Sequence, residues 1–269
     1  MKKMMNRAIS SAALYMHYVS LNVRSAMQYK ASLLLMMMGQ LLVSFSTFLG
    51  IHFMFMRFEH VKGYTYPEVL VCFAIVLLQF SLAEMFARGF DTFAGIVRRG
   101  EFDRVLVRPR STILQVLGAK FELTRMGRMA QALLIFGYAM GNGGIQWTPG
   151  RVFALGMMIL GGIVLFSALF LLYAAICFFT LEGLEFMNVF TDGGREYGKY
   201  PIDVYGKRIL QFSTVVIPYA LVQVYPLQYL LGRNDQWLSA FCPLGAGVFM
   251  LVCYACWRIG VAHYTSSGS

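Results

Sequence analysis

The chain has 269 residues, of which 58% are hydrophobic and 13% charged, and its formal net charge is +10. Soluble globular domains carry about 25% charged residues, so this composition excludes an ordinary soluble domain and indicates a membrane protein. The five cysteines lie mostly in apolar runs with no histidine or carboxylate nearby, and we expect them to pack rather than to bind metal.

Residues 8–30 are predicted to form an amphipathic helix in the cytoplasmic headgroup layer. Apolar residues recur at helical spacing on one face, polar residues lie on the other, and the chain up to Lys30 carries five basic and no acidic residues. The apolar face comprises Ile9, Ala12, Met16, Val19, Val23, Ala26 and Met27. The alternative is an irregular N-terminal extension. We take residues 1–30 as one unit, ahead of a membrane domain over residues 31–265.

Six apolar runs follow, and each is predicted to be a transmembrane helix, since about 20 apolar residues span a bilayer. They are Ala31–Met56, Val69–Ala87, Met129–Met140, Val152–Leu181, Ile209–Leu231 and Ala240–Trp257. The third run is short, so Arg125 and Arg128 are expected to extend toward the headgroups, and the start of this span stays open. Prolines interrupt the fifth run, and residues 226–241 could instead form a re-entrant hairpin. The predicted fold is all-α and polytopic.

The basic residues predict the orientation of these spans. Nineteen of the 23 fall in the N-terminal segment, the loop over residues 88–125 with Arg128 just beyond it, the loop over residues 182–208, and the C-terminal segment. Because basic residues are retained on the cytoplasmic side, both termini and both loops are predicted to be cytoplasmic. An even number of spans agrees with this. The net charge therefore indicates topology and attraction to anionic lipid, rather than a nucleic acid partner.

The loop over residues 88–125 is predicted to be ordered. Phe90, Phe93 and Val97 recur at helical spacing and Gly100 ends that helix, while Thr112 and Gln115 have the spacing of a capping box for a second helix. Helix, turn and helix in a charged segment indicate a surface on which a partner docks. The alternative is a solvated loop that binds nothing.

Few groups suggest chemistry. Glu84, near the cytoplasmic edge of the second span, is predicted to form a gating or packing pair with Arg88, its i+4 neighbour, rather than a substrate or proton site. Residues 193–199 match seven positions of the phosphate-binding loop, but Tyr200 occupies the position that requires a magnesium-binding hydroxyl. We expect no catalytic residue, no metal site and no cofactor on this chain.

Three segments carry a family resemblance. They are Gly-Glu-Phe-Asp-Arg-Val-Leu-Val-Arg-Pro at residues 100–109, Tyr-Pro-Ile-Asp-Val-Tyr at residues 200–205, and Ile-Pro at residues 217–218. Together with the N-terminal helix and six spans, they make the chain resemble the permease subunits of ABC-2-type transporters. The likeness covers nearly the whole chain and is closest to the bacterial branch in which two different permeases pair over one type of ATPase.

The resemblance implies an export permease with an ABC-2 (type V exporter-like) fold in the bacterial cytoplasmic membrane. Two permeases, identical or different, would form the path, and separate ATPase subunits with ATP and Mg²⁺ would drive efflux. The loop would dock on the ATPase through a set of apolar and charged residues. That set is Phe90, Phe93, Val97, Glu101, Asp103, Arg104, Arg108 and Arg110. The substrate, expected to be apolar or amphipathic, is not implied. The alternatives are a membrane-embedded enzyme acting on lipid and a membrane anchor of a complex.

Overall fold

The structure is a computed structural model that describes residues 2–180 and 184–265, with side chains from residue 11 onward. The junction of the predicted fourth span with the loop at residue 182, and the predicted roles of Ile9 and the first basic residues, therefore lie outside the described part. The longer helices are α1 (Lys2–Gln28), α2 (Lys30–Arg57), α3 (Tyr66–Asp91), α7 (Met126–Asn142), α8 (Pro149–Ile176) and α13 (Gly245–His263).

The shorter elements lie at the ends of these helices or between α8 and α13. They are α4 (Phe93–Arg98), α5 (Phe102–Leu106), α6 (Thr112–Ala119), η1 (Leu123–Arg125), η2 (Leu184–Val189), α9 (Asp192–Tyr197), η3 (Ile202–Tyr205), α10 (Lys207–Val215), α11 (Tyr219–Val222), α12 (Val224–Leu230) and η4 (Trp237–Leu244). The described residues are thus mostly helical and form no strand, and they contain a single isolated β-bridge between Val61 and Tyr64.

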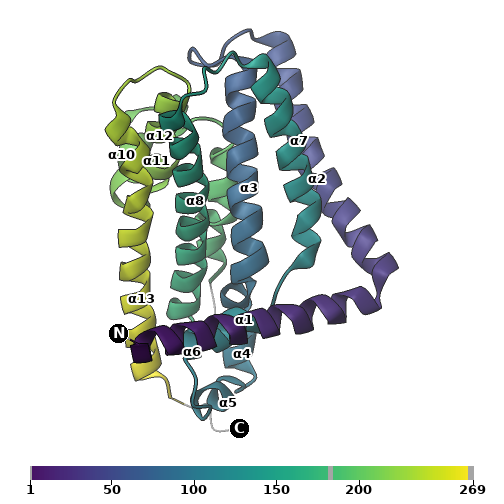
Figure 1. The fold of residues 1–269 in the computed structure, drawn as a ribbon, viewed down its shortest axis with the longest axis vertical. Coiled ribbons are helices and arrows are strands. Elements are labelled where there is room, and N and C mark those ends of the chain that lie inside the picture. The colour runs from purple at the N-terminus through teal and green to yellow at the C-terminus, as the bar shows by residue number, and fades with distance from the viewer. Residues whose placement is uncertain (1, 181–183, 266–269) are drawn as a thin grey trace.

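Helix α3 is the centre of the bundle. It packs against α7 on one side and α8 on the other, and α8 packs against α13 (Figure 1). Of its most apolar stretch 83% is buried, against 11% for α2. Residues 69–83 of α3 are uncharged on every face, which makes this position possible, because a helix without a polar face is stable only when it is surrounded by apolar groups. Residues 88–125 and the C-terminal end of α13 lie at one end of the bundle, called here the loop end, and residues 58–65 lie at the far end.

Helix α1 crosses the loop end at a steep angle to the bundle (Figure 1). Its side chains Tyr15, Tyr18 and Asn22 contact the bundle: the Tyr15 hydroxyl donates to the Phe86 carbonyl at 3.0 Å, and Asn22 donates to the Gly118 carbonyl at 3.3 Å. Met16 and Met27, on the predicted apolar face, are exposed. A helix over most of residues 8–30 is therefore present, and its predicted apolar face is divided between these exposed methionines and the half-buried Val19, Val23 and Ala26.

Two polar contacts and one glycine hold α2 to its neighbours. Ser44 donates to the Gln131 carbonyl oxygen on α7, and His52 Nδ1 lies 3.0 Å from the Tyr66 hydroxyl. At Gly127 the backbones of α2 and α7 come so close that an added Cβ would lie 2.3 Å from the Met37 carbonyl oxygen. Such an approach is possible only without a side chain.

After α8, the chain returns along α3 toward the far end. Arg195 lies over the Phe80 ring at 5.1 Å, the Cys72 thiol donates to the Gly198 carbonyl at 3.5 Å, and the Tyr64 hydroxyl donates to Asp203 Oδ2 at 2.8 Å. Each successive partner is nearer the start of α3. The prediction that residues 182–208 form a loop at the same end as residues 88–125 is therefore wrong for the described residues 198–205, and Lys199, Lys207 and Arg208 lie away from the loop end.

Helices α10 to α12 form a hairpin that enters from the far end. At its tip, Tyr219 donates to the Phe190 carbonyl, deep between α3 and α8. Its exit is back at the far end, where Arg233 binds the Gly63 carbonyl at 2.7 Å and Glu68 at 2.6 Å. The chain bends by 88° between the two arms. The predicted fifth span Ile209–Leu231 is therefore not a straight crossing, because Ile217-Pro218 breaks it, and residues 237–244 continue into α13 rather than forming a re-entrant segment.

By length and apolar composition, four described helical stretches could span a membrane, and up to five if the bent pair is one span. The four are Lys30–Arg57, Tyr66–Arg98, Pro149–Ile176 and Trp237–His263. They match the predicted first, second, fourth and sixth spans. Helix α7, the predicted third span, has 17 residues and starts at Met126. A count of six spans remains a prediction.

Replacing Gly127 by alanine is expected to lower the melting temperature of the detergent-purified protein, because the new methyl group forces α2 and α7 apart at a cost of about 1–3 kcal/mol. The matched control is Gly137→Ala on the same helix, where an added Cβ meets nothing within 4 Å. Melting is followed by tryptophan fluorescence. Equal melting temperatures for the two variants would contradict the close approach of α2 and α7.

Candidate functional site

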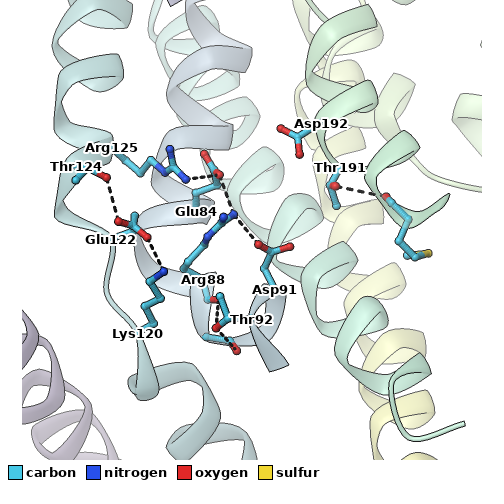
Figure 2. Close-up of polar contacts among 12 residues, drawn as sticks. Glu84, Arg88, Asp91, Thr92, Lys120, Glu122, Thr124, Arg125, Thr191 and Asp192 are labelled. Carbon is cyan, nitrogen blue, oxygen red and sulfur yellow. Dashed lines mark hydrogen bonds and ion pairs between the residues drawn. The ribbon is translucent and has the colours of Figure 1, made fainter. Parts of the chain in front are cut away.

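A buried carboxylate, Glu84, joins three elements at the loop end. Its side chain is 5% exposed and binds Arg88 Nη1 at 3.1 Å on α3, Arg125 Nη2 at 3.1 Å in η1, and Arg128 on α7. Figure 2 shows Glu84, Arg88 and Arg125 converging, with Asp91 on the other side of Arg88. Arg88 also binds Asp91 Oδ2 at 2.6 Å. Two carboxylates thus face three guanidinium groups, and the cluster keeps an excess positive charge.

Aromatic packing extends this ion cluster along α3. The Arg128 guanidinium lies 5.6 Å from the centre of the Phe80 ring, and that of Arg195 lies 5.1 Å from it. An arginine near an aromatic face gains about 0.5–2 kcal/mol, more where water is excluded. Arg128 is 3% exposed, so it does not extend toward the headgroups as predicted but is held inside the bundle by Glu84 and Phe80.

A second small cluster fastens residues 120–125 to the same helix. The Glu122 amide donates to the Met85 carbonyl at 3.2 Å, and the Glu122 carboxylate accepts from Lys120 and from Thr124 (Figure 2). Partial burial would raise the pKa of Glu122, but Lys120, Thr124 and Arg125 together lower the pKa below its usual value. The group therefore stays ionised, and the loop is tied to α3 at both of its ends.

An aromatic core gives the loop its shape. Phe93 lies 5.1 Å from both Trp257 and Phe178, and 5.2 Å from Phe102, between ring centroids. Trp257 belongs to α13, and Phe178 directly follows α8. Phe93 and Phe102 are fully buried. Helices α4 and α5 are thus packed onto the inner ends of α8 and α13, so the loop and these two helices form one packed body.

Gln115, on α6, binds the backbone of the turn between α5 and α6. Its side-chain nitrogen donates to the carbonyls of Val105 at 3.1 Å and Arg110 at 3.2 Å. The predicted capping box of Thr112 with Gln115 is therefore wrong: α6 does start at Thr112, but Ser111 precedes it as the cap residue and Gln115 binds the preceding turn instead. Gly100, with φ of 65°, forms the predicted turn after α4.

The structure divides the predicted docking residues into two groups. Phe90, Phe93 and Val97 are 4%, 0% and 7% exposed, so in this conformation they are core residues of the loop and not surface anchors. The charged residues lie outward: Arg104, Arg108 and Arg110 are exposed, and Glu101 pairs with Arg99 at 2.8 Å. Val107, which was not among the predicted docking residues, is 82% exposed at the tip of the loop.

The sequence analysis did not predict that several residues belong to this site. Asp91, Phe102, Phe178 and Trp257 each belong to a contiguous apolar or charged stretch, and nothing local marks them as partners. Arg125 and Arg128 were noticed, but as residues that reach for headgroups. Their position along the chain was the available signal. Glu84 lies just before the loop over residues 88–125 and both arginines lie at its end, so the chain returns to the level of Glu84 where they occur.

Two other features of the described chain bear on the chemistry that the sequence suggested. No group of three or more His, Cys, Asp or Glu side chains that could hold a metal occurs among the described residues. The segment that resembles a phosphate-binding loop has its Gly198 carbonyl bound by Gln223 and Cys72, inside the bundle. The arrangement is thus suited to mechanical linkage between a surface loop and membrane helices.

Replacing Glu84 by glutamine is expected to destabilise the protein by about 3–5 kcal/mol, since three buried or half-buried guanidinium groups lose their shared counter-charge. Chemical denaturation in detergent measures the loss. Glu101→Gln, which removes an exposed partner of Arg99, is the matched control and should leave stability nearly unchanged. A Glu84→Gln protein as stable as the Glu101→Gln control would refute the central role of the carboxylate.

Comparison with known proteins gives one match. A family model described as ABC-2 family transporter protein matches residues 41–268. No curated protein and no solved structure matches the chain.

Proposed function

The chain belongs to the ABC-2 family of transporter proteins, and we propose that it is the permease subunit of an ATP-driven exporter in a bacterial cytoplasmic membrane. ATP and Mg²⁺ are assigned to separate ATPase subunits, and this chain contributes the membrane helices and the loop over residues 88–125. The observation that carries the proposal is the packing of that loop. It presents an exposed tip while its own core is continuous with α8 and α13.

In this mechanism the ATPase binds the exposed tip from Arg104 to Arg110. Closure of the ATPase dimer on ATP displaces the loop. Because Phe93 and Phe102 pack against Phe178 and Trp257, and Glu84 joins α3 to α7, the displacement reaches four membrane helices rather than being lost in a flexible segment. A packed interior transmits such a shift because it has few alternative arrangements.

A second permease, identical or different, is proposed to complete the export path. Helix α2 leaves a large apolar surface uncovered by its own chain, including Leu35, Leu42 and Phe53 at 70%, 61% and 61% exposure. Gly137, Gly141 and Gly156 would meet nothing within 4 Å if they carried a Cβ, so these glycines are open to another helix. By contrast, Gly161 and Gly162 are used inside the subunit, against Pro243 and Gln79. The substrate is proposed to be apolar or amphipathic.

The proposed orientation places the loop end and both termini in the cytoplasm. An externally added, membrane-impermeant maleimide is expected to label cysteines placed at Trp147 and Lys207, and to reach one placed at Arg104 only after the membrane is opened. Lys207 follows Asp203, which binds Tyr64 at the far end. Labelling of Lys207→Cys from the same side as Arg104→Cys would overturn the path assigned to residues 192–205.

Replacing Val107 by aspartate is expected to reduce co-purification of the ATPase subunit and ATP-driven export about tenfold, which corresponds to losing one apolar anchor worth about 1.4 kcal/mol. Because Val107 is 82% exposed, the variant should reach the membrane in normal amounts. Arg57→Glu, an exposed change at the far end, is the control. Unchanged ATPase binding and export in Val107→Asp together with Arg104→Glu would exclude the tip as the docking surface.

A further inference from the structure

Two adjoining hollows open on the side of the bundle that α1 crosses. The larger has a volume of about 570 Å³ and is almost wholly apolar; its walls include Phe86, Leu171, Met250 and Leu251, with Tyr15 of α1 at one edge. The smaller, of about 320 Å³, is lined by Ser111, Thr112, Trp257 and Arg258. Both are lined by Ile113 and Tyr254, so they are parts of one groove. Volumes of about 300–1,000 Å³ are those of ligand sites.

The smaller hollow carries an uncompensated positive charge. Arg258 is exposed and forms no ion pair or hydrogen bond with any residue that the structure describes, whereas Arg88, Arg125 and Arg128 are all paired. Ser111 and Thr112, two residues that carry hydroxyl groups, line the same hollow. A guanidinium group with neighbouring hydroxyls suits a phosphate oxygen, for which arginine is the preferred partner.

The order of residues along α13 fits a lipid. Arg258 lies nearest the loop end, Tyr254 comes next, and Met250 and Leu251 lie further toward the middle of the bundle. At 1.5 Å per helical residue, the charged and apolar groups are separated by about 12 Å. Tyr254, which is 44% exposed, stands between them, and amphipathic aromatic rings of this kind favour the membrane interface. Headgroup, interface and chain regions thus follow one another in the groove.

We propose that this groove binds an anionic phospholipid from the leaflet at the loop end. Arg258, with Ser111 and Thr112, would hold the phosphate, and the apolar hollow would take an acyl chain against Leu171, Met250 and Leu251. Because the walls come from α1, α3, α6, α8 and α13, the bound lipid fastens the surface helix α1 to the bundle. The Tyr15 hydroxyl bond to Phe86 is the protein's own contact at the same edge. The site does not depend on what the protein transports.

The test is native mass spectrometry of the full chain released from nanodiscs that contain equal amounts of phosphatidylglycerol and phosphatidylcholine. The wild-type protein is expected to retain one phosphatidylglycerol in preference to phosphatidylcholine. Arg258→Gln should reduce this preference roughly tenfold, or about 1.4 kcal/mol, because the charge-assisted hydrogen bond to the phosphate is lost. Arg57→Gln, an exposed change at the far end, controls for a general loss of positive charge and should keep the preference.

A second variant tests the apolar half of the groove. Leu251→Trp fills the larger hollow without altering charge, and it should lower retention of both lipids, while the melting temperature in detergent reports that the variant is folded. Equal phosphatidylglycerol preference in the wild type and Arg258→Gln would overturn the headgroup assignment. Undiminished retention by a folded Leu251→Trp protein would overturn the acyl-chain assignment. A rise in melting temperature with inorganic phosphate alone as large as that with phosphatidylglycerol would overturn it as well.

Discussion

The position of Glu84 constrains much of this structure. A carboxylate that is 5% exposed within a membrane bundle is stable only when cations reach it, and those cations come from α3, η1 and α7. Arg88 begins the loop over residues 88–125 and Arg125 ends it, so one carboxylate closes the loop at both ends. The short helix α7 is thereby fixed against α3, even though its 17 residues make it the shortest of the long helices.

Ion pairs and aromatic packing stabilise the loop end in different ways. The ions determine which elements meet, because a buried charge tolerates few partners. The aromatic core around Phe93 and Trp257 supplies most of the apolar burial, since each large ring that leaves water contributes on the order of 2–3 kcal/mol. Together they make the loop a structural extension of α8 and α13. The loop therefore has a defined shape within this chain alone.

Much of this fold could be predicted from the sequence. The parts that could not be predicted depend on contacts between residues far apart in the chain. The apolar runs at α2, α3, α8 and α13 are long, and Phe90 to Gly100 has a clear helical period, so these elements were predictable. The return of residues 192–205 along α3 was not, because its polar residues look like a solvent loop until Tyr64 and Gln223 are seen to bind Asp203 and Gly198. The burial of Phe93 could not be predicted for the same reason: two of its three ring partners, Phe178 and Trp257, are more than 80 residues away.

The sequence separation within the Glu84 cluster has a consequence for how the protein is made. Arg88 leaves the ribosome four residues after Glu84, but Arg128 follows 44 residues later, which at about 5–20 residues per second is roughly 2–9 s. During that interval α3 reaches the membrane with a carboxylate and without two of its final cations. Of the three arginines that bind Glu84 in the folded chain, Arg88 alone has then been synthesised with it.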